Sequence, residues 1–188
     1  IANSNFTIEF WVQRHRAPGA GSDKVLEQVG CHSSDTRLHK LSLRDYKSSY
    51  GPGKVDFEFL VTVDGTSASN EIQIVDGTPA AGSWAHLAFA FSAADNGGNI
   101  YRDGVKQTVY NSKAVDLMPI TCTQPLRVGT SLLGLMDELR IWRTTRSPEQ
   151  IGASYNTQIM SAPELAVSLL FDQPDLGLDS STNSNNAV

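Results

Sequence analysis

The stretch Gly134-Leu135-Met136-Asp137-Glu138-Leu139-Arg140-Ile141-Trp142 decides the fold class of this chain. Leu139 and Ile141 share one face of an extended strand, whereas Met136 falls on the opposite parity. One apolar face can continue along the stretch only if an extra residue is inserted near Asp137 and Glu138, which is the pattern of a β-bulge. We therefore predict a bulged strand at residues 134–142.

The residues that follow this strand predict a short helix. Ser147 can serve as the N-cap, and Pro148 suits the first helical position. Gln150 stands three residues after the serine, where it can complete a capping box. We expect this helix to run from Ser147 to about Asn156.

Further strands are predicted on both sides of this segment, because apolar and polar residues alternate with a period of two. The clearest are residues 6–12, 55–63 and 84–91, and the shorter ones are 25–29, 38–44, 71–75, 99–102, 105–110, 126–128 and 165–171. Asp103-Gly104 between two of them predicts a two-residue hairpin with a type I′ turn. Many short strands with almost no helix indicate an all-β fold, a two-sheet antiparallel β-sandwich of the jelly-roll type.

Length and composition agree with one globular domain that does not bind nucleic acid. The chain has 188 residues, of which 40% are hydrophobic, enough for one sizeable core. Lys and Arg total 15 against 20 Asp and Glu, and the net charge of -5 argues against a polyanionic partner. No apolar run approaches the length of about 18 residues that a membrane span requires.

Two features favour an extracellular protein. Cys31 and Cys122 are too far apart in sequence for the short-range ligand pairs of a zinc site, which leaves a disulfide or two free thiols. A disulfide between them is the favoured prediction. Asn5-Phe6-Thr7 is an N-glycosylation sequon, with Asn5 as the acceptor.

Five blocks of sequence occur in the order seen in one known family. They are Phe6-Thr7-Ile8-Glu9-Phe10-Trp11-Val12, Trp84-Ala85-His86-Leu87-Ala88, Ile100-Tyr101-Arg102-Asp103-Gly104, Leu126-Arg127-Val128-Gly129, and the bulged strand with its helix. Over residues 6–156 the chain resembles the laminin-G-like, concanavalin A-like jelly-roll domains. The resemblance implies two curved antiparallel sheets, used in extracellular proteins for adhesion or glycan binding, and implies no particular reaction.

The chain departs from the family pattern at its ends. Members usually open with a strand and an acidic, Asn- and Gly-rich loop before the Phe-Thr-Ile-Glu-Phe-Trp block, whereas here a similar element stands at residues 169–186. We therefore expect a jelly-roll domain at 1–160 and, at 161–188, a linker and strand. The strand at 165–171 either completes this sandwich or pairs with a neighbouring copy, because an unpaired edge strand is a template for addition.

Catalysis is not expected. In the glucanases that share the fold this chain resembles, one strand carries the motif Glu-x-Asp-x-Glu. Its alternate carboxylates project to one face and act as nucleophile and acid/base. This chain offers only Asp56 with Glu58 and the adjacent Asp137 and Glu138. None of its four histidines lies in a nucleophile-elbow or metal-ligand pattern.

The candidate ligand-binding residues are Trp11, Trp84 and His86, which share the non-core faces of their strands. One interpretation is an exposed platform on which a sugar stacks. The alternative is a buried cross-strand network in which Glu9, His86 and Arg140 lock the sheet. The second interpretation is favoured because these residues belong to blocks that the family shares.

Calcium is the expected cofactor. Hard cations bind several carboxylate and carbonyl oxygens, and the family resemblance implies that a bulge aspartate meets acids of the opening loop. The matching residues are Asp137, Asp172 and Asp179. The alternative is that the last two cap turns.

The leading prediction is a non-catalytic extracellular or cell-surface binding and adhesion module, one unit of a tandem-repeat or filament-forming protein. The alternative is a carbohydrate-binding module of a secreted polysaccharide-processing enzyme. The expected partners are accordingly a glycan or neighbouring copies of the same protein.

Overall fold

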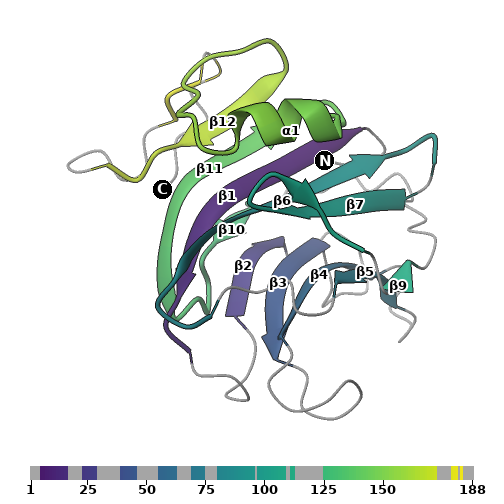
Figure 1. Cartoon of the computed structure of the whole chain (residues 1–188), viewed down its shortest axis with the longest axis vertical. Helices are drawn as coiled ribbons and strands as arrows, with labels where there is room; N and C mark the ends of the chain where they lie inside the picture. Colours follow the sequence, from purple (N-terminus) through teal and green to yellow (C-terminus); the bar gives the residue numbers. More distant parts are fainter. Residues whose placement is uncertain are drawn as a thin grey trace.

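The computed structural model shows a sandwich of two antiparallel sheets (Figure 1). It describes residues 5–16, 23–28, 39–45, 55–62, 69–74, 80–95, 97–108, 111–112, 125–172, 179–181 and 183. Only the backbone is described for residues 27–28, 39–45, 55–62, 69–74 and 111–112. Within these ranges, no helix is long and apolar enough to cross a membrane.

The first sheet has the strand order β12-β11-β1-β6-β7-β8. Its strands are β1 (Phe6–Arg14), β6 (Trp84–Ser92), β7 (Gly97–Arg102), β8 (Val105–Lys106), β11 (Gly134–Trp142) and β12 (Leu165–Leu169). The second sheet has the order β10-β2-β3-β4-β5-β9. Its strands are β2 (Asp23–Gln28), β3 (His39–Asp45), β4 (Val55–Thr62), β5 (Ser69–Ile74), β9 (Asn111–Ser112) and β10 (Arg127–Val128). The predicted two-sheet antiparallel fold is confirmed, with strand boundaries shifted by one to a few residues.

The core lies between the two sheets, where alternate residues of the long strands meet. Among the residues whose side chains are described, the first sheet contributes one face of β1, β6, β7, β11 and β12, and β2 contributes from the second sheet. The buried side chains include Ile8, Phe10 and Val12 of β1, Leu87 and Phe89 of β6, and Val25 and Leu26 of β2. The opposite face of the first sheet is therefore the outer face of the molecule.

The predicted bulge is confirmed in β11. Between the pairs Glu9–Arg140 and Trp11–Asp137, β11 advances by three residues while β1 advances by two. Glu138 has a φ of 48°, a left-handed conformation that non-glycine residues adopt rarely. The extra residue restores the inward face, because Met136 packs against the same core as Leu139.

Helix α1 (Pro148–Ser154) begins as predicted and ends two residues early. Both hydrogen bonds of the capping box are present, one between the Ser147 side chain and the Gln150 backbone and one in the reverse direction. In Figure 1, α1 lies over the outer face of the first sheet. Its Ile151 packs there with Ala88, Ala90 and Tyr101.

The hairpin between β7 and β8 fits under the end of this helix. Asp103 and Gly104 have φ values of 49° and 78°, as the predicted type I′ turn requires. A Cβ atom at Gly104 would lie 2.7 Å from the Tyr155 ring. Glycine is therefore required here for its conformation and for the close approach of the ring.

The strand at the C-terminal side completes this sandwich. β12 pairs with β11 through Leu139–Leu169, Arg140–Ser168 and Ile141–Val167. Asp179 forms a bridge with Leu169, and Ser180 donates a backbone hydrogen bond to Ser168. β12 therefore forms the edge of the first sheet of its own chain.

An ion cluster holds the two sheets together where β1 ends and β2 begins. The carboxylate of Asp23 is fully buried and accepts hydrogen bonds from Arg14, from Arg16 at 2.8 Å and from the Leu133 backbone at 3.1 Å. Burial raises the pKa of Asp23, but these hydrogen bonds and the charge of Arg14 outweigh it and bring the pKa below its ordinary value.

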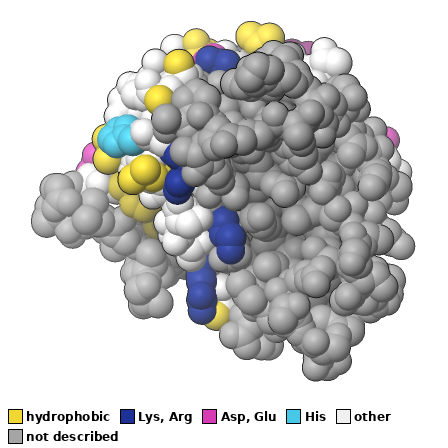
Figure 2. All heavy atoms as spheres, turned by 90° about the horizontal axis from the view of Figure 1, so that it is seen from below, with side chains coloured by type: hydrophobic (Ala, Val, Ile, Leu, Met, Phe, Trp, Pro, Cys, Tyr) yellow, Lys and Arg dark blue, Asp and Glu magenta, His cyan; other side chains and the backbone are white. Residues whose placement is uncertain are grey.

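The surface seen from below the view of Figure 1 carries several Lys and Arg side chains, which lie roughly in a line (Figure 2).

Candidate ligand-binding site

The outer face of the first sheet consists of rows of side chains that cross three strands. One row runs from Arg140 through Glu9 to Ala88, and the next from Asp137 through Trp11 to His86. A third row places Leu135, Gln13 and Trp84 side by side. Helix α1 and the segment after it cover the first of these rows, whereas Leu135 and Trp84 are exposed.

A buried polar network lies under the helix. Glu9 is fully buried, and its Oε1 accepts hydrogen bonds from Trp142 at 2.6 Å and Arg146 at 2.7 Å. The guanidinium of Arg140 lies 3.6 Å from the same oxygen, and Nε2 of His86 lies 3.5 Å from Oε2. Burial raises the pKa of Glu9, but His86, Arg146 and Arg140 outweigh it and bring the pKa below its ordinary value.

Glu9, His86 and Arg140 thus form the buried cross-strand network that the sequence offered as the alternative to an exposed sugar-stacking platform. His86 is 1% exposed and lies beneath the rings of Trp11 and Tyr155, with centroids 5.7 and 5.9 Å away. Its side chain is therefore not part of the surface that a ligand can reach. It supports that surface from below.

The bulge brings two consecutive carboxylates to the outer face. Asp137 accepts a hydrogen bond from the Glu138 backbone at 2.8 Å, which stabilises the left-handed residue. The Glu138 carboxylate is bound by Arg140, whose guanidinium also donates to the Thr157 carbonyl at 2.7 Å. Arg140 therefore ties the bulge to the chain that follows the helix.

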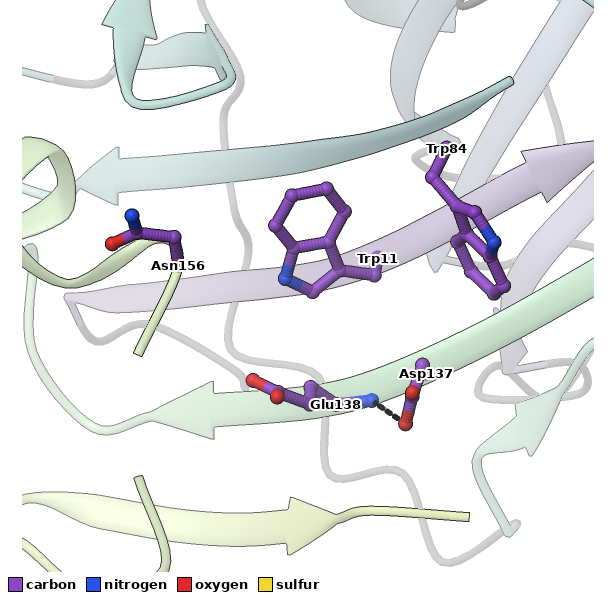
Figure 3. A pocket seen from close by; sticks show the side chains of 5 residues that line it. All are labelled: Trp11, Trp84, Asp137, Glu138 and Asn156. Atoms are coloured by element: carbon purple, nitrogen blue, oxygen red, sulfur yellow. Dashed lines mark hydrogen bonds between the residues drawn. The ribbon is translucent and has the colours of Figure 1, made fainter. Parts of the chain in front are cut away.

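A pocket of about 300 Å³ lies above this bulge. It is lined by Trp11 of β1, Trp84 of β6, Asp137 and Glu138 of β11, and Asn156, just after α1. Figure 3 shows the two indole rings on one side and the two carboxylates on the other, with Asn156 at the far end. Its volume is at the lower end of the range for small-molecule pockets, about 300 to 1,000 Å³.

The two tryptophans differ in how firmly they are held. Trp11 donates its Nε1 to the Tyr155 carbonyl at 3.2 Å and contacts the edge of the His86 ring. Its ring is therefore fixed by α1 and by the buried network. Trp84 is 43% exposed, and its Nε1 has no hydrogen-bond partner among the described residues.

Polar groups in the pocket are available for a ligand. One carboxylate oxygen of Asp137 and the side-chain amide of Asn156 have no hydrogen-bond partner within the described part of the chain. Burial raises the pKa of Asp137, and the negative charges of Glu138 and Asp172 raise it further. The hydrogen bond from the Glu138 backbone offsets only part of this rise.

The three predicted calcium ligands are not brought together. Asp172 is close enough to Asp137 to raise its pKa, but Asp179 is used elsewhere. Its carboxylate accepts hydrogen bonds from the Ser168 and Ser181 backbones at 2.8 and 2.9 Å and from the Ser181 hydroxyl at 2.8 Å. Within the described ranges, no three His, Cys, Asp or Glu side chains form a group that could hold a metal ion. Calcium binding remains a prediction.

The other predicted sites lie away from this pocket. Asn5 is exposed at the start of β1, where its side-chain oxygen accepts a hydrogen bond from the Ala93 backbone. Cys31 and Cys122, and the side chains of Asp56 and Glu58, fall outside the part of the chain whose side chains are described. Glycosylation at Asn5 and the disulfide therefore remain predictions.

The sequence did not indicate that Asn156 and Glu138 line this pocket. Asn156 follows a helix that could be predicted, but nothing in the local pattern indicates that its end turns toward Trp11. The parity slip at residues 136–139 located the bulge. Both carboxylates line the pocket because Glu138 has a left-handed backbone conformation, which the sequence alone does not reveal.

A family model described as the concanavalin A-like lectin/glucanases superfamily matches residues 1–152. The chain belongs to this family. No curated protein matches it in sequence.

Several solved structures share the fold of this chain but little of its sequence. A proposed carbohydrate-binding protein from Bacteroides ovatus is 14% identical with a TM-score of 0.65, and the match covers 95% of this chain and 49% of that one. This chain therefore spans about half of the length of that protein.

Two further structures contain bound sugars. The CBM40 of the Ruminococcus gnavus IT-sialidase, bound to α2,3-sialyllactose, is 10% identical with a TM-score of 0.56, and the match covers 81% of this chain and 84% of that one. Domain 4 of the extracellular arabinanase AbnA from Geobacillus stearothermophilus, in complex with arabinotriose, is 18% identical with a TM-score of 0.54. That match covers 81% of this chain and 66% of the arabinanase domain's chain. At these identities the similarities show the fold alone.

Proposed function

We propose that this domain is a non-catalytic carbohydrate-binding module whose glycan occupies the pocket between Trp11 and Trp84. The observation that carries the proposal is the composition of this pocket. It combines two indole rings with one oxygen of Asp137 and the amide of Asn156, neither of which has a partner among the described residues, on the outer face of the first sheet. Apolar walls with a few placed polar groups are typical of small-molecule sites.

A sugar ring matches both kinds of surface. Its C–H face packs against an aromatic ring, and its hydroxyls donate to carboxylates or exchange hydrogen bonds with an amide. In the proposed complex, Trp84 provides the exposed ring, while Asp137 accepts from a hydroxyl and Asn156 both donates and accepts. The fixed Trp11 forms the floor, so little side-chain entropy is lost on binding.

The relatives support this choice over the adhesive alternative. They include a proposed carbohydrate-binding protein and two modules that hold bound oligosaccharides. The donor-strand form of the adhesive alternative needs the strand at 165–171 to pair with a neighbouring copy, whereas β12 pairs with β11 of its own sheet. Secretion, expected for a protein that meets glycans outside the cell, is part of the same proposal.

The absence of catalysis is also proposed, because the Glu138 carboxylate is held by the buried Arg140. A carboxylate tied to a buried guanidinium in this way is engaged in the structure and is not free to act as an acid or a nucleophile. Asp137 alone does not provide the pair of carboxylates that glycoside hydrolysis uses.

Trp84→Ala tests the proposal directly. Wild-type protein is first screened on a glycan array, and the best glycan is titrated by calorimetry. The variant should bind at least about fivefold more weakly, since stacking on an aromatic side chain contributes about 1 to 3 kcal/mol per ring where it has been measured with nucleobases. Its stability should change little, because the ring is 43% exposed.

Val105→Ala is the matched control, because Val105 is also exposed, at 64%, but lies on β8 outside the pocket lining. It should leave the affinity unchanged. Wild-type protein that binds no glycan on the array, or a Trp84→Ala variant that binds as well as wild type, would contradict the proposed function.

A further inference from the structure

We infer that this pocket selects neutral glycans and rejects those that carry a carboxylate on the bound sugar. The inference rests on the proposed glycan site and adds its ligand class. It starts from an asymmetry among the residues that line the pocket. Of the five lining residues in the described part of the chain, Asp137 and Glu138 are acidic and none is basic.

The nearest described surroundings add negative charge. Asp172 acts on Asp137 from outside the lining, so three carboxylates lie in one neighbourhood. A bound carboxylate would meet these charges inside a partly buried site, where electrostatic interactions are stronger than in bulk water. A hydroxyl, in contrast, donates a hydrogen bond to the free oxygen of Asp137 and is favoured by the same charges.

The basic side chain tied to the bulge cannot serve an anionic ligand. Arg140 is fully buried, and its guanidinium is bound by Glu138 and by the carbonyls of Thr157 and Ser154. It also lies 3.6 Å from the Glu9 carboxylate. An anion could reach it only by displacing Glu138. We therefore assign Glu138 a second task besides lining the pocket: it shields Arg140 from the ligand.

This arrangement makes Glu138→Gln a specificity variant. Glutamine has nearly the same shape, but the substitution removes one negative charge and leaves the guanidinium of Arg140 without its charged partner at the pocket edge. Acidic glycans should gain affinity relative to neutral ones. Asp137→Asn removes the other pocket charge without touching Arg140, and it serves as a second variant if Glu138→Gln folds poorly.

The experiment compares pairs of glycans that differ by one carboxylate. An array carries neutral glycans beside their sialylated or uronic-acid counterparts, including lactose and α2,3-sialyllactose. The best neutral ligand and its acidic counterpart are then titrated with wild type, with both variants and with Glu164→Gln. Glu164 is exposed in the turn before β12 and outside the pocket lining, so this control changes the net charge equally.

Wild-type protein should bind the neutral member at least tenfold more tightly. This ratio should fall at least threefold in Glu138→Gln and Asp137→Asn and stay constant in Glu164→Gln. Equal or tighter binding of the acidic member, or a ratio that neither pocket variant changes, would overturn the inference and leave the proposed function standing.

Two other outcomes are distinguished by the same titrations. Acidic binding that appears with Ca²⁺ and disappears with EDTA would also overturn the inference, because the carboxylates would then hold a cation that recruits anions. Wild type that binds no glycan of either kind would instead reject the proposed function, and the inference with it.

Discussion

At the scale of single residues, Asp137 and Glu9 show how neighbouring charges shift the pKa values of two desolvated carboxyl groups in opposite directions. Both are desolvated, which by itself raises a carboxyl pKa. Glu9 lies among His86, Arg140 and Arg146, so its charge is stabilised. Asp137 lies near two other acids, and its charge is disfavoured. A group held at such a cost in a pocket is a candidate for ligand binding.

Asp137→Asn should separate binding from stability. The asparagine side-chain oxygen can still accept the hydrogen bond from the Glu138 backbone, while the repulsion with Asp172 and Glu138 is removed. We expect the free energy of unfolding at pH 7 to stay within about 0.5 kcal/mol of wild type or to increase. Affinity for the neutral glycan should fall at least fivefold.

Urea unfolding and calorimetry measure these two quantities. Asp95→Asn, at an exposed position in the loop after β6, is the control and should change neither one. A large loss of stability in Asp137→Asn would show that the carboxylate is structural.

Glu9→Gln, unlike Asp137→Asn, should lower the free energy of unfolding substantially. The substitution keeps acceptor atoms for Trp142 and Arg146 but leaves the buried charges of Arg140 and Arg146 without their shared counter-ion. Removing one partner of a buried ion pair costs about 3 to 5 kcal/mol. Urea denaturation should show a loss of this size, whereas an exposed change such as Glu164→Gln should cost less than about 0.5 kcal/mol. A loss below 1 kcal/mol in Glu9→Gln would mean that the network is not an energetic unit.

At the scale of elements, α1 connects the fold to the pocket. The helix is short, and its capping box fixes where it starts. Its far end places the carbonyl of Tyr155 on Trp11 and carries Asn156 to the pocket. Arg140 binds the same segment through Thr157. The helix and the bulged strand therefore hold opposite sides of one site.

Ser147→Ala should weaken this connection. It removes the side-chain acceptor for the Gln150 backbone, and loss of an N-cap costs about 1 kcal/mol. Thermal or urea unfolding should report this decrease, and Ser147→Asp, which keeps an acceptor, should restore most of it. An alanine variant as stable as wild type would show that packing of Ile151 alone determines the helix.

At the scale of the whole molecule, Glu9 and Asp23 link stability to pH. Both folded-state pKa values lie below the ordinary values of 4.5 and 3.8. A carboxyl with a lowered folded pKa contributes stability above its unfolded pKa and loses it as the pH falls through the folded value. Asp137, with a raised pKa, acts in the opposite sense in the same acidic range.

The free energy of unfolding should therefore be nearly constant above about pH 6 and should fall progressively below about pH 4.5. Urea titrations at a series of pH values measure this dependence. Glu9→Gln should flatten the decline below pH 4.5, because one of the two titrating groups is removed. A stability that rises on acidification through this range would contradict the assignment of Glu9 and Asp23 as stabilising charges.

Some of this molecule was readable from local patterns. The alternation of residues in β1 and β6, the turn chemistry of Asp103-Gly104 and the capping residues of α1 each act over a few positions, so short segments predict them. The parity slip around Met136 located the bulge for the same reason. The ends of strands were predicted less accurately, because hydrogen bonding to a neighbouring strand determines where a strand such as β8 stops.

By itself, the sequence determined the all-β class, the bulged strand with its capped helix, and Trp11, Trp84 and Asp137 as candidate residues. Only the tertiary structure decided which of the outer-face residues meet a ligand. Glu9 and His86 lie on the same sheet face as Trp11, but both are buried beneath α1 and the segment after it. Asn156 reaches the pocket beside Trp11, although the two residues are far apart in the sequence. Burial and cross-strand charge depend on these long-range contacts, and strand periodicity carries no information about them.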